Sequence, residues 1–227
     1  MKTLLTLDYE VFFGRNTGTV ARTMIEPTEA LVKVADRHGA KLAFFVDAGF
    51  ILRLRSEMGK APALRAEHDA VCRQVERLAR AGHEIQLHIH PHWEDSRWED
   101  GGWKIDVSRS ALHAFEPDAI RDIVGRYAAA LRELAGPRSA YAFRAGGWVI
   151  QPFHKLRPAL REAGVTIDST VYAVGAPPSL SISRRLPPRV AGASTPIPWW
   201  RTSTAASSRC RSPAGGCART SSGASPA

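Results

Sequence analysis

The sequence of 227 residues has few cysteines and no long apolar run, and residues 176–227 contain neither an acid nor a lysine. Cys72, Cys210 and Cys217 are odd in number and lack metal-ligand spacing, so the sequence supports neither a disulfide framework nor a zinc ribbon. No apolar stretch approaches the roughly 20 residues that span a bilayer. The N-terminus is also too poor in apolar residues for a signal peptide. We therefore expect a cytoplasmic protein with no membrane partner.

The net charge of +9 is distributed unevenly along the chain. Residues 1–175 hold 24 lysines and arginines and all 22 acids, whereas residues 176–227 hold seven arginines. The body is nearly neutral and the basic character belongs to the tail, so we expect no nucleic-acid partner. We predict one catalytic domain over residues 1–175 and a separate tail over residues 176–227.

The tail is rich in Ser, Ala, Pro, Arg and Gly and has no amphipathic period, which is typical of a disordered basic segment. A second hypothesis is a frameshift near residues 173–197. With G/C-rich codons, residues 198–212 can be encoded so that another frame reads an Asp-Gly turn followed by Phe-Val-Glu-Val-Pro-Ile. That alternative contains acids and resembles a continuation of the domain.

Strand-like and helix-like segments alternate over the first 167 residues. Strands are predicted at 2–8, 41–46, 84–88, 140–143 and 165–167, and helices at 26–38, 64–80, 117–135 and 153–163. This alternation predicts parallel strands joined by crossover helices, hence an α/β layered or barrel fold. In such folds the chemistry gathers where the strands end. The polar residues at these positions are Asp8, Asp47, His88, Arg144 and Asp168.

Four of the eight histidines lie between Gly82 and Trp93. His88 and His92 are four residues apart, so a helical turn or a tight bend at Pro91 can direct both at one point. Imidazole is the commonest metal-ligating side chain. We therefore predict a metal site that uses these two histidines, and we expect His83 and His90 to have structural or supporting roles.

Asp8 and Glu10 lie two apart at the end of the first predicted strand, so both point to one side of an extended chain. Two such carboxylates can divide the work, one as a metal ligand and the other as a base. The sequence does not decide which takes which role.

Five segments together resemble the polysaccharide deacetylase family, the NodB homology domain, over roughly residues 2–175. Thr-Leu-Asp-Tyr-Glu at 6–10 resembles the first motif, and Ala-Phe-Phe-Val at 43–46 resembles a strand of the family. The others are Gly-His-Glu-Ile at 82–85 leading to His88 and His92, Phe-Arg-Ala-Gly-Gly-Trp at 143–148, and Val-Thr-Ile-Asp-Ser at 165–169.

The resemblance implies a distorted (β/α) barrel, incomplete at the C-terminus, and a divalent metal, with zinc the first choice and cobalt, manganese or nickel as alternatives. Tyr9 stands where the family usually has a second aspartate. The family's late histidine has no counterpart, because no histidine follows His154. The implied metal ligands are Glu10, His88 and His92, and the implied catalytic residues are Asp8 as base, Arg144 as the partner that holds Asp8, and Asp168 as an orienting group.

The activity that the resemblance implies is removal of acetyl groups from a carbohydrate. Two alternatives stay open: hydrolysis of a non-sugar amide, and an inactive fragment that binds sugar or metal. Trp93, Trp98 and Trp103 recur every five residues and predict either sugar stacking or a loop anchored by aromatic rings. Trp93 and Trp148 are the candidate substrate contacts.

Overall fold

The computed structural model describes residues 3–12 and 18–170, which form an α/β fold around one parallel sheet. The strand order is β1-β2-β3-β6-β7, with every neighbouring pair parallel. The strands are β1 (Leu5–Tyr9), β2 (Leu42–Asp47), β3 (Glu84–Ile89), β6 (Ala142–Ala145) and β7 (Ile167–Asp168). Parallel pairing requires a crossover after each strand, and helices supply those crossovers.

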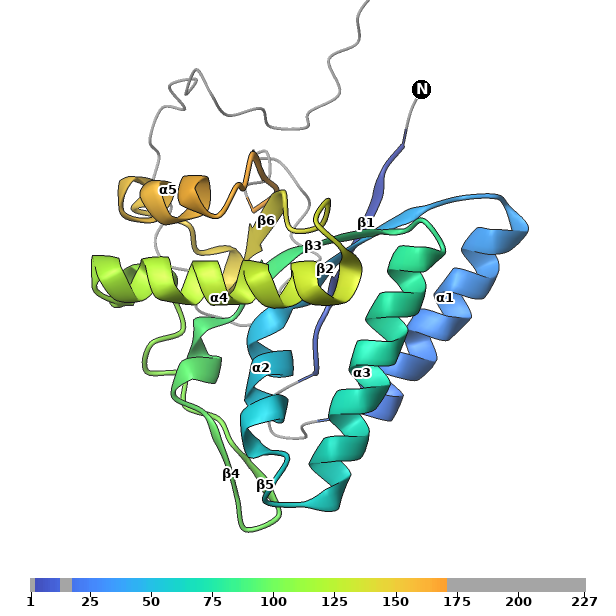
Figure 1. The fold of residues 1–227 in the computed structure, drawn as a ribbon, viewed down its shortest axis with the longest axis horizontal. Helices are drawn as coiled ribbons and strands as arrows, with labels where there is room; N and C mark the ends of the chain where they lie inside the picture. The colour runs from blue at the N-terminus through green and yellow to red at the C-terminus, as the bar shows by residue number, and fades with distance from the viewer. Residues whose placement is uncertain (1–2, 13–17, 171–227) are drawn as a thin grey trace, which may run out of the picture.

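Helices α2, α3 and α4 pack against the central strand β3, and α5 packs on α4 (Figure 1). The π-helix η1 (Ala21–Ile25) leads into α1. The helices are α1 (Glu26–Arg37), α2 (Ala48–Glu57), α3 (Pro62–Arg80), α4 (Pro117–Ala135) and α5 (Phe153–Glu162). Four of them end close to a glycine with a positive φ, as α1 does at Gly39 (φ +61°) and α3 at Gly82 (φ +82°), which is a common way to stop a helix.

The two faces of the sheet differ in chemistry. Side chains alternate between the faces of a strand, so Phe44, Leu87 and Phe143 all point to one face and are buried there. The other face carries polar residues, among them His88 and Arg144. The helices thus cover the apolar face of the sheet, and the candidate functional side chains lie on the polar face.

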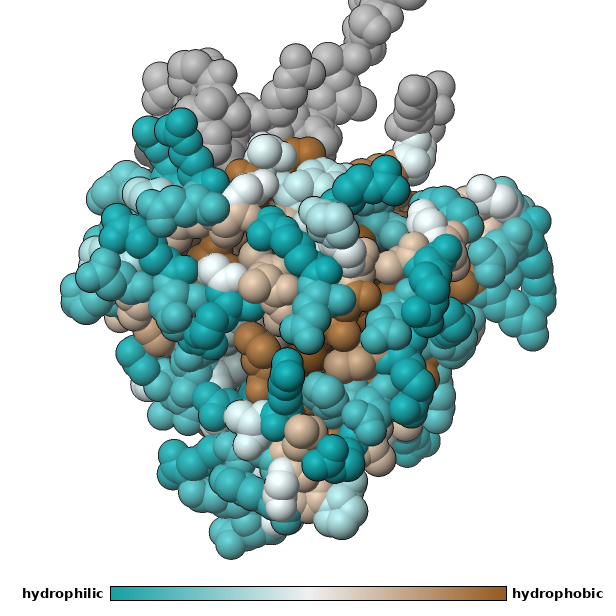
Figure 2. All heavy atoms as spheres, viewed as in Figure 1, coloured by the Kyte–Doolittle hydropathy of each residue, from teal (hydrophilic) through white to brown (hydrophobic). Residues whose placement is uncertain are grey.

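The side of the molecule seen in Figure 2 is mostly hydrophilic, and its hydrophobic residues gather in the hollow between the helices. Within the described ranges 3–12 and 18–170, no helix is both long and apolar enough to cross a membrane.

Most predicted elements are confirmed within a few residues, and the mixed α/β class with a parallel sheet is confirmed. Besides the short π-helical and 3₁₀ turns, helix α2 and a hairpin were not predicted. Asp47 is the N-cap of α2, and its side chain accepts a hydrogen bond from the backbone N–H of Phe50 at 3.4 Å. A hairpin of β4 (Arg97–Glu99) and β5 (Gly102–Lys104) lies inside the predicted loop 93–106.

A closed barrel is not confirmed. Over residues 3–12 and 18–170 the sheet is open, with β1 and β7 as its two edges. The domain boundary at 175, the tail 176–227 and the frameshift hypothesis lie outside the described residues.

Substitution of Leu87 in β3 tests whether the helix-covered face of the sheet forms the core, since this side chain is fully buried there. Leu87→Ala should lower the free energy of unfolding by about 2–5 kcal/mol, from lost transfer free energy and the cavity left behind. Val34→Ala is the control, because Val34 is 49% exposed on α1, and its effect should stay within about 0.5 kcal/mol. Chemical denaturation measures both, and equal losses would contradict the assignment of the core.

Candidate metal centre

Polar side chains meet where three neighbouring strands end. Asp47 pairs in register with His88, and His88 pairs with Arg144. Tyr9 of the edge strand β1 pairs with Val46. Glu10, the next residue along the chain, therefore lies level with Asp47, in the same row as His88 and Arg144. The predicted convergence of strand ends is therefore present for β1, β2, β3 and β6.

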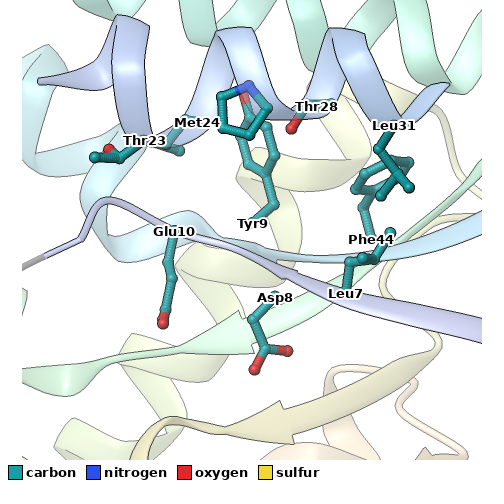
Figure 3. A pocket seen from close by; sticks show the side chains of 10 residues that line it. Leu7, Asp8, Tyr9, Glu10, Thr23, Met24, Thr28, Leu31 and Phe44 are labelled. Atoms are coloured by element: carbon teal, nitrogen blue, oxygen red, sulfur yellow. The ribbon is translucent and has the colours of Figure 1, made fainter. Parts of the chain in front are cut away.

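Asp8 and Glu10 project from the same side of β1, while Tyr9 projects from the opposite side (Figure 3). Tyr9 lies among the helices, where its hydroxyl donates to Gln74 Oε1 of α3 at 2.8 Å. A cleft lies between β1 and the helices η1 and α1, on the Tyr9 side of the strand; Asp8 and Glu10 border it, but their side chains point away from those helices. The strand period of two thus separates the chemical side of β1 from its packing side.

Glu10, His88 and His90 form a compact group whose ligand atoms all lie within 4.8 Å of one another. Glu10 Oε2 is 3.1 Å from His88 Nε2 and 2.5 Å from His90 Nε2. Both histidines are buried, whereas the Glu10 side chain is 33% exposed. One carboxylate oxygen and two imidazole nitrogens suit a divalent ion such as zinc, so the group could hold a metal.

The hydrogen bond made by His88 Nδ1 assigns the tautomer of this ring. Nδ1 lies 2.8 Å from the backbone oxygen of Arg144, and because a carbonyl oxygen only accepts, Nδ1 carries the hydrogen. In the neutral ring Nε2 then presents a lone pair to the Glu10 carboxylate. The lone pairs of His88 Nε2 and of the Glu10 oxygen repel each other unless a proton or a metal ion lies between these two atoms. Metal-ligating histidines usually donate their other ring N–H in this way.

Glu10 and His90 shift each other's pKa so that the charged form of each is favoured. Burial by itself would raise the pKa of Glu10, but the His88 and His90 side chains next to its carboxylate hold that pKa below its usual range. Burial by itself would lower the pKa of His90, but the hydrogen bond to Glu10 and the charge of Asp47 raise it. The group therefore keeps an ionised carboxylate against a buried ring.

Asp8 is held away from this group by Arg144. The guanidinium donates from Nη1 to Asp8 Oδ1 at 2.5 Å and from Nη2 to the hydroxyls of Thr6 and Ser169 at 2.8 and 2.9 Å. It also lies over the Phe45 ring, 4.0 Å from the centroid. The structure thus separates the two carboxylates that the sequence left interchangeable: Glu10 lies with the histidines and Asp8 with Arg144.

His92 is not brought into the group, contrary to its predicted place as a ligand. It lies on the 3₁₀ turn η2 (Pro91–Glu94), with its ring 4.9 Å from that of Trp93, and its buried position lowers its pKa to about 4. His90 takes the position instead. The missed signal is the strand period: β3 runs on to Ile89, so His88 and His90, two apart, share one face.

Trp93 is also not where a substrate contact would be. It is 1% exposed, its indole N–H donates to Asp47 Oδ2 at 2.6 Å, and its ring packs on Phe50 and Trp103. The prediction that Trp93 stacks on a sugar is wrong for this structure, because neither ring face is open. The alternative of a loop anchored by aromatic rings describes this region.

Asp168 is buried at the end of β7 and accepts a hydrogen bond from the backbone N–H of Thr170 at 2.9 Å. It pairs in register with Phe143, the residue before Arg144, so Asp168 and Arg144 leave opposite faces of the sheet. Burial raises the pKa of Asp168. Trp148 follows β6 with a φ of +57° and is 44% exposed, so its role as a substrate contact stays a prediction.

No family model and no curated protein matches this chain. Similar solved structures include a putative polysaccharide deacetylase from Mycobacterium smegmatis, 20% identical with a TM-score of 0.43, covering 74% of this chain and 50% of that one. A peptidoglycan N-acetylglucosamine deacetylase is 18% identical with a TM-score of 0.41, covering 73% of this chain and 55% of that one.

Both neighbours carry the name deacetylase, the class that the sequence motifs resemble. This chain spans about half the length of each. Likeness at this level does not assign the chain to a family, so its function is inferred from its own residues.

The ligand set can be tested by removing single histidines. His90→Ala should weaken zinc binding by at least roughly 100-fold, because loss of outer partners alone costs 10–100-fold. His92→Ala should change the zinc affinity by no more than about threefold, and the exposed His38→Ala serves as the control. Equilibrium dialysis with elemental analysis measures all three, with melting temperatures as a check on folding. Loss of zinc from His92→Ala but not from His90→Ala would restore the ligand pair expected from the sequence.

Proposed function

We propose that this chain is a metal-dependent hydrolase that removes acetyl groups from an N- or O-acetylated carbohydrate. The observation that carries the proposal is the group of Glu10, His88 and His90, with His88 held by its Nδ1–H so that its Nε2 lone pair faces the carboxylate. Three protein ligands leave coordination positions open, which is the pattern of a catalytic rather than a structural zinc site.

The position of Asp8 favours a hydrolase over a protein that only binds a metal ion. Asp8 lies on the same face of β1 as Glu10, yet it is bound to Arg144 and not to the histidines. A carboxylate that accepts a hydrogen bond from a guanidinium, beside the possible metal group but outside it, is placed to accept a proton. The four contacts of Arg144 hold that carboxylate in a fixed orientation.

When bound, a divalent ion would polarise the acetyl carbonyl and acidify a water molecule. Glu10, His88 and His90 would hold the ion. Asp8 would accept the proton that the water gives up as its oxygen adds to the acetyl carbon. Asp8 would then pass this proton to the leaving nitrogen or oxygen as the C–N or C–O bond breaks, which yields acetate and a free amine or hydroxyl.

The carbohydrate part of the proposal rests on the motif resemblance and on Trp148. This ring is partly exposed at the end of β6, next to the turn that follows Arg144 and Ala145. Exposed aromatic faces beside polar groups suit sugar rings. A hydrolase of simple amides would use the same metal group without such a surface, so the choice of substrate separates the two functions.

Replacing Asp8 by Asn tests the base. Asp8→Asn removes the proton acceptor while keeping the shape of the side chain, so acetate release should fall by about 10²–10⁴-fold with bound zinc unchanged. Asp36→Asn, on the exposed side of α1, is the matched control and should leave the rate unchanged. The assay measures acetate from an N-acetylglucosamine oligomer and, in parallel, from a simple N-acetyl amine.

Each other result has a definite meaning. Loss of zinc from Asp8→Asn would make Asp8 a ligand, and equal rates on both substrates would favour the amide hydrolase. Zinc and glycan binding by the wild type without acetate release would mean an inactive binding protein.

A further inference from the structure

Gly146 lies directly against one ring of the metal group. The register of β3 and β6 pairs His88 with Arg144 and Ile89 with Ala145, and His90 and Gly146 are the residues that follow this last pair. Residues 144 and 146 leave the same side of the chain, as do residues 88 and 90. A side chain at position 146 would therefore emerge beneath the His90 ring.

The space for such a side chain is already filled by that ring. A Cβ atom built on Gly146 would lie 2.5 Å from His90 Nδ1, 2.7 Å from Cε1 and 2.8 Å from Cγ. Ordinary contact begins near 3.4 Å, so the ring would have to move by close to 1 Å. Because Cγ is among the three atoms, a small swing of the far end of the ring does not relieve the contact.

The other neighbours of His90 restrict where the ring can go. The His88 ring stands edge-on to it with 4.7 Å between centroids, and the His92 ring lies 5.3 Å away. His90 is only 9% exposed. The φ of Gly146 lies outside the left-handed region, so the conflict of a larger residue is steric and not a matter of backbone strain.

We propose that Gly146 is a positioning residue for the metal group: its missing side chain is what allows His90 Nε2 to reach Glu10. This inference rests on the proposed function, in which His90 is a ligand. A ligand atom must lie within about 0.2 Å of its ideal distance to bind well. If the ring is displaced by several times that amount, His90 Nε2 can no longer bind the metal ion, while Glu10 and His88 keep their positions.

The test is the zinc affinity of Gly146→Ala, measured by competition with a chromophoric chelator, together with the visible absorption of the cobalt(II)-loaded protein. Zinc affinity should fall by about 10–100-fold, as for other residues that orient a ligand. The cobalt spectrum should shift toward that of His90→Ala. An unchanged affinity and spectrum would overturn the inference.

Two glycines supply matched controls. Gly147→Ala adds the same methyl group one residue later, where no atom lies within 4 Å but φ is +62°. Gly125→Ala adds it on α4, again in open space. Both variants should bind zinc as the wild type does. If Gly147→Ala weakens zinc as much as Gly146→Ala, the turn and not the ring contact positions the site, and the inference fails.

The double variant Gly146→Ala/His90→Ala keeps the test decisive if Gly146→Ala does not fold. Without the ring the methyl group has room, so the double variant should fold and bind zinc as His90→Ala does. A further loss of affinity or of folding in the double variant would contradict the inference. Absence of zinc binding in the wild type would instead refute the proposed function, so the two failures are distinguishable.

Discussion

The hydrogen bond from His88 Nδ1 to the backbone oxygen of Arg144 is the interaction on which the site depends. It joins β3 to β6 through a side chain, at the row where these strands end. It also fixes which nitrogen of the ring carries the hydrogen, and so leaves Nε2 as a lone pair directed at Glu10. Without it the ring could turn or change tautomer, and Glu10 would face a donor. The capacity of the group to hold a metal ion therefore depends on one contact between a ring and a main-chain carbonyl.

Arg144 connects the two halves of the proposed chemistry. Its carbonyl orients the ring of His88, while its guanidinium holds Asp8 and is itself fixed by Thr6, Ser169 and the face of Phe45. A shift of this residue would thus disturb the ligand and the base together. The same strand end continues into Gly146, whose lack of a side chain admits His90. Three features of residues 144–146, namely the Arg144 carbonyl, the Arg144 guanidinium and the missing side chain of Gly146, therefore organise groups that come from β1 and β3.

The sequence predicts the fold class and the strand ends well, because hydrophobic periodicity and glycine stops are local signals. It also places Asp8, Glu10, His88 and Arg144 near one another, since all lie at or just after the ends of parallel strands. It fails where the outcome depends on distant partners. The length of β3 decides whether His90 or His92 lies beside Glu10, and β3 is paired up to Ile89 with β6, more than 50 residues away. Trp93 is buried with its indole N–H bound to Asp47, 46 residues away in the chain. Neither of these contacts can be predicted from the residues that neighbour His90 or Trp93 in the sequence.

The most direct test of the central claim is to locate a metal ion by anomalous diffraction at the zinc edge, from crystals of the full chain grown with zinc. The ion should lie about 2.0–2.2 Å from a Glu10 oxygen and from Nε2 of both His88 and His90, with His88 Nδ1 still donating to the Arg144 carbonyl. A zinc ion bound by His92 in place of His90, or held by Asp8 in place of Glu10, would contradict the account. So would a saturating zinc concentration that leaves no anomalous peak between these three residues.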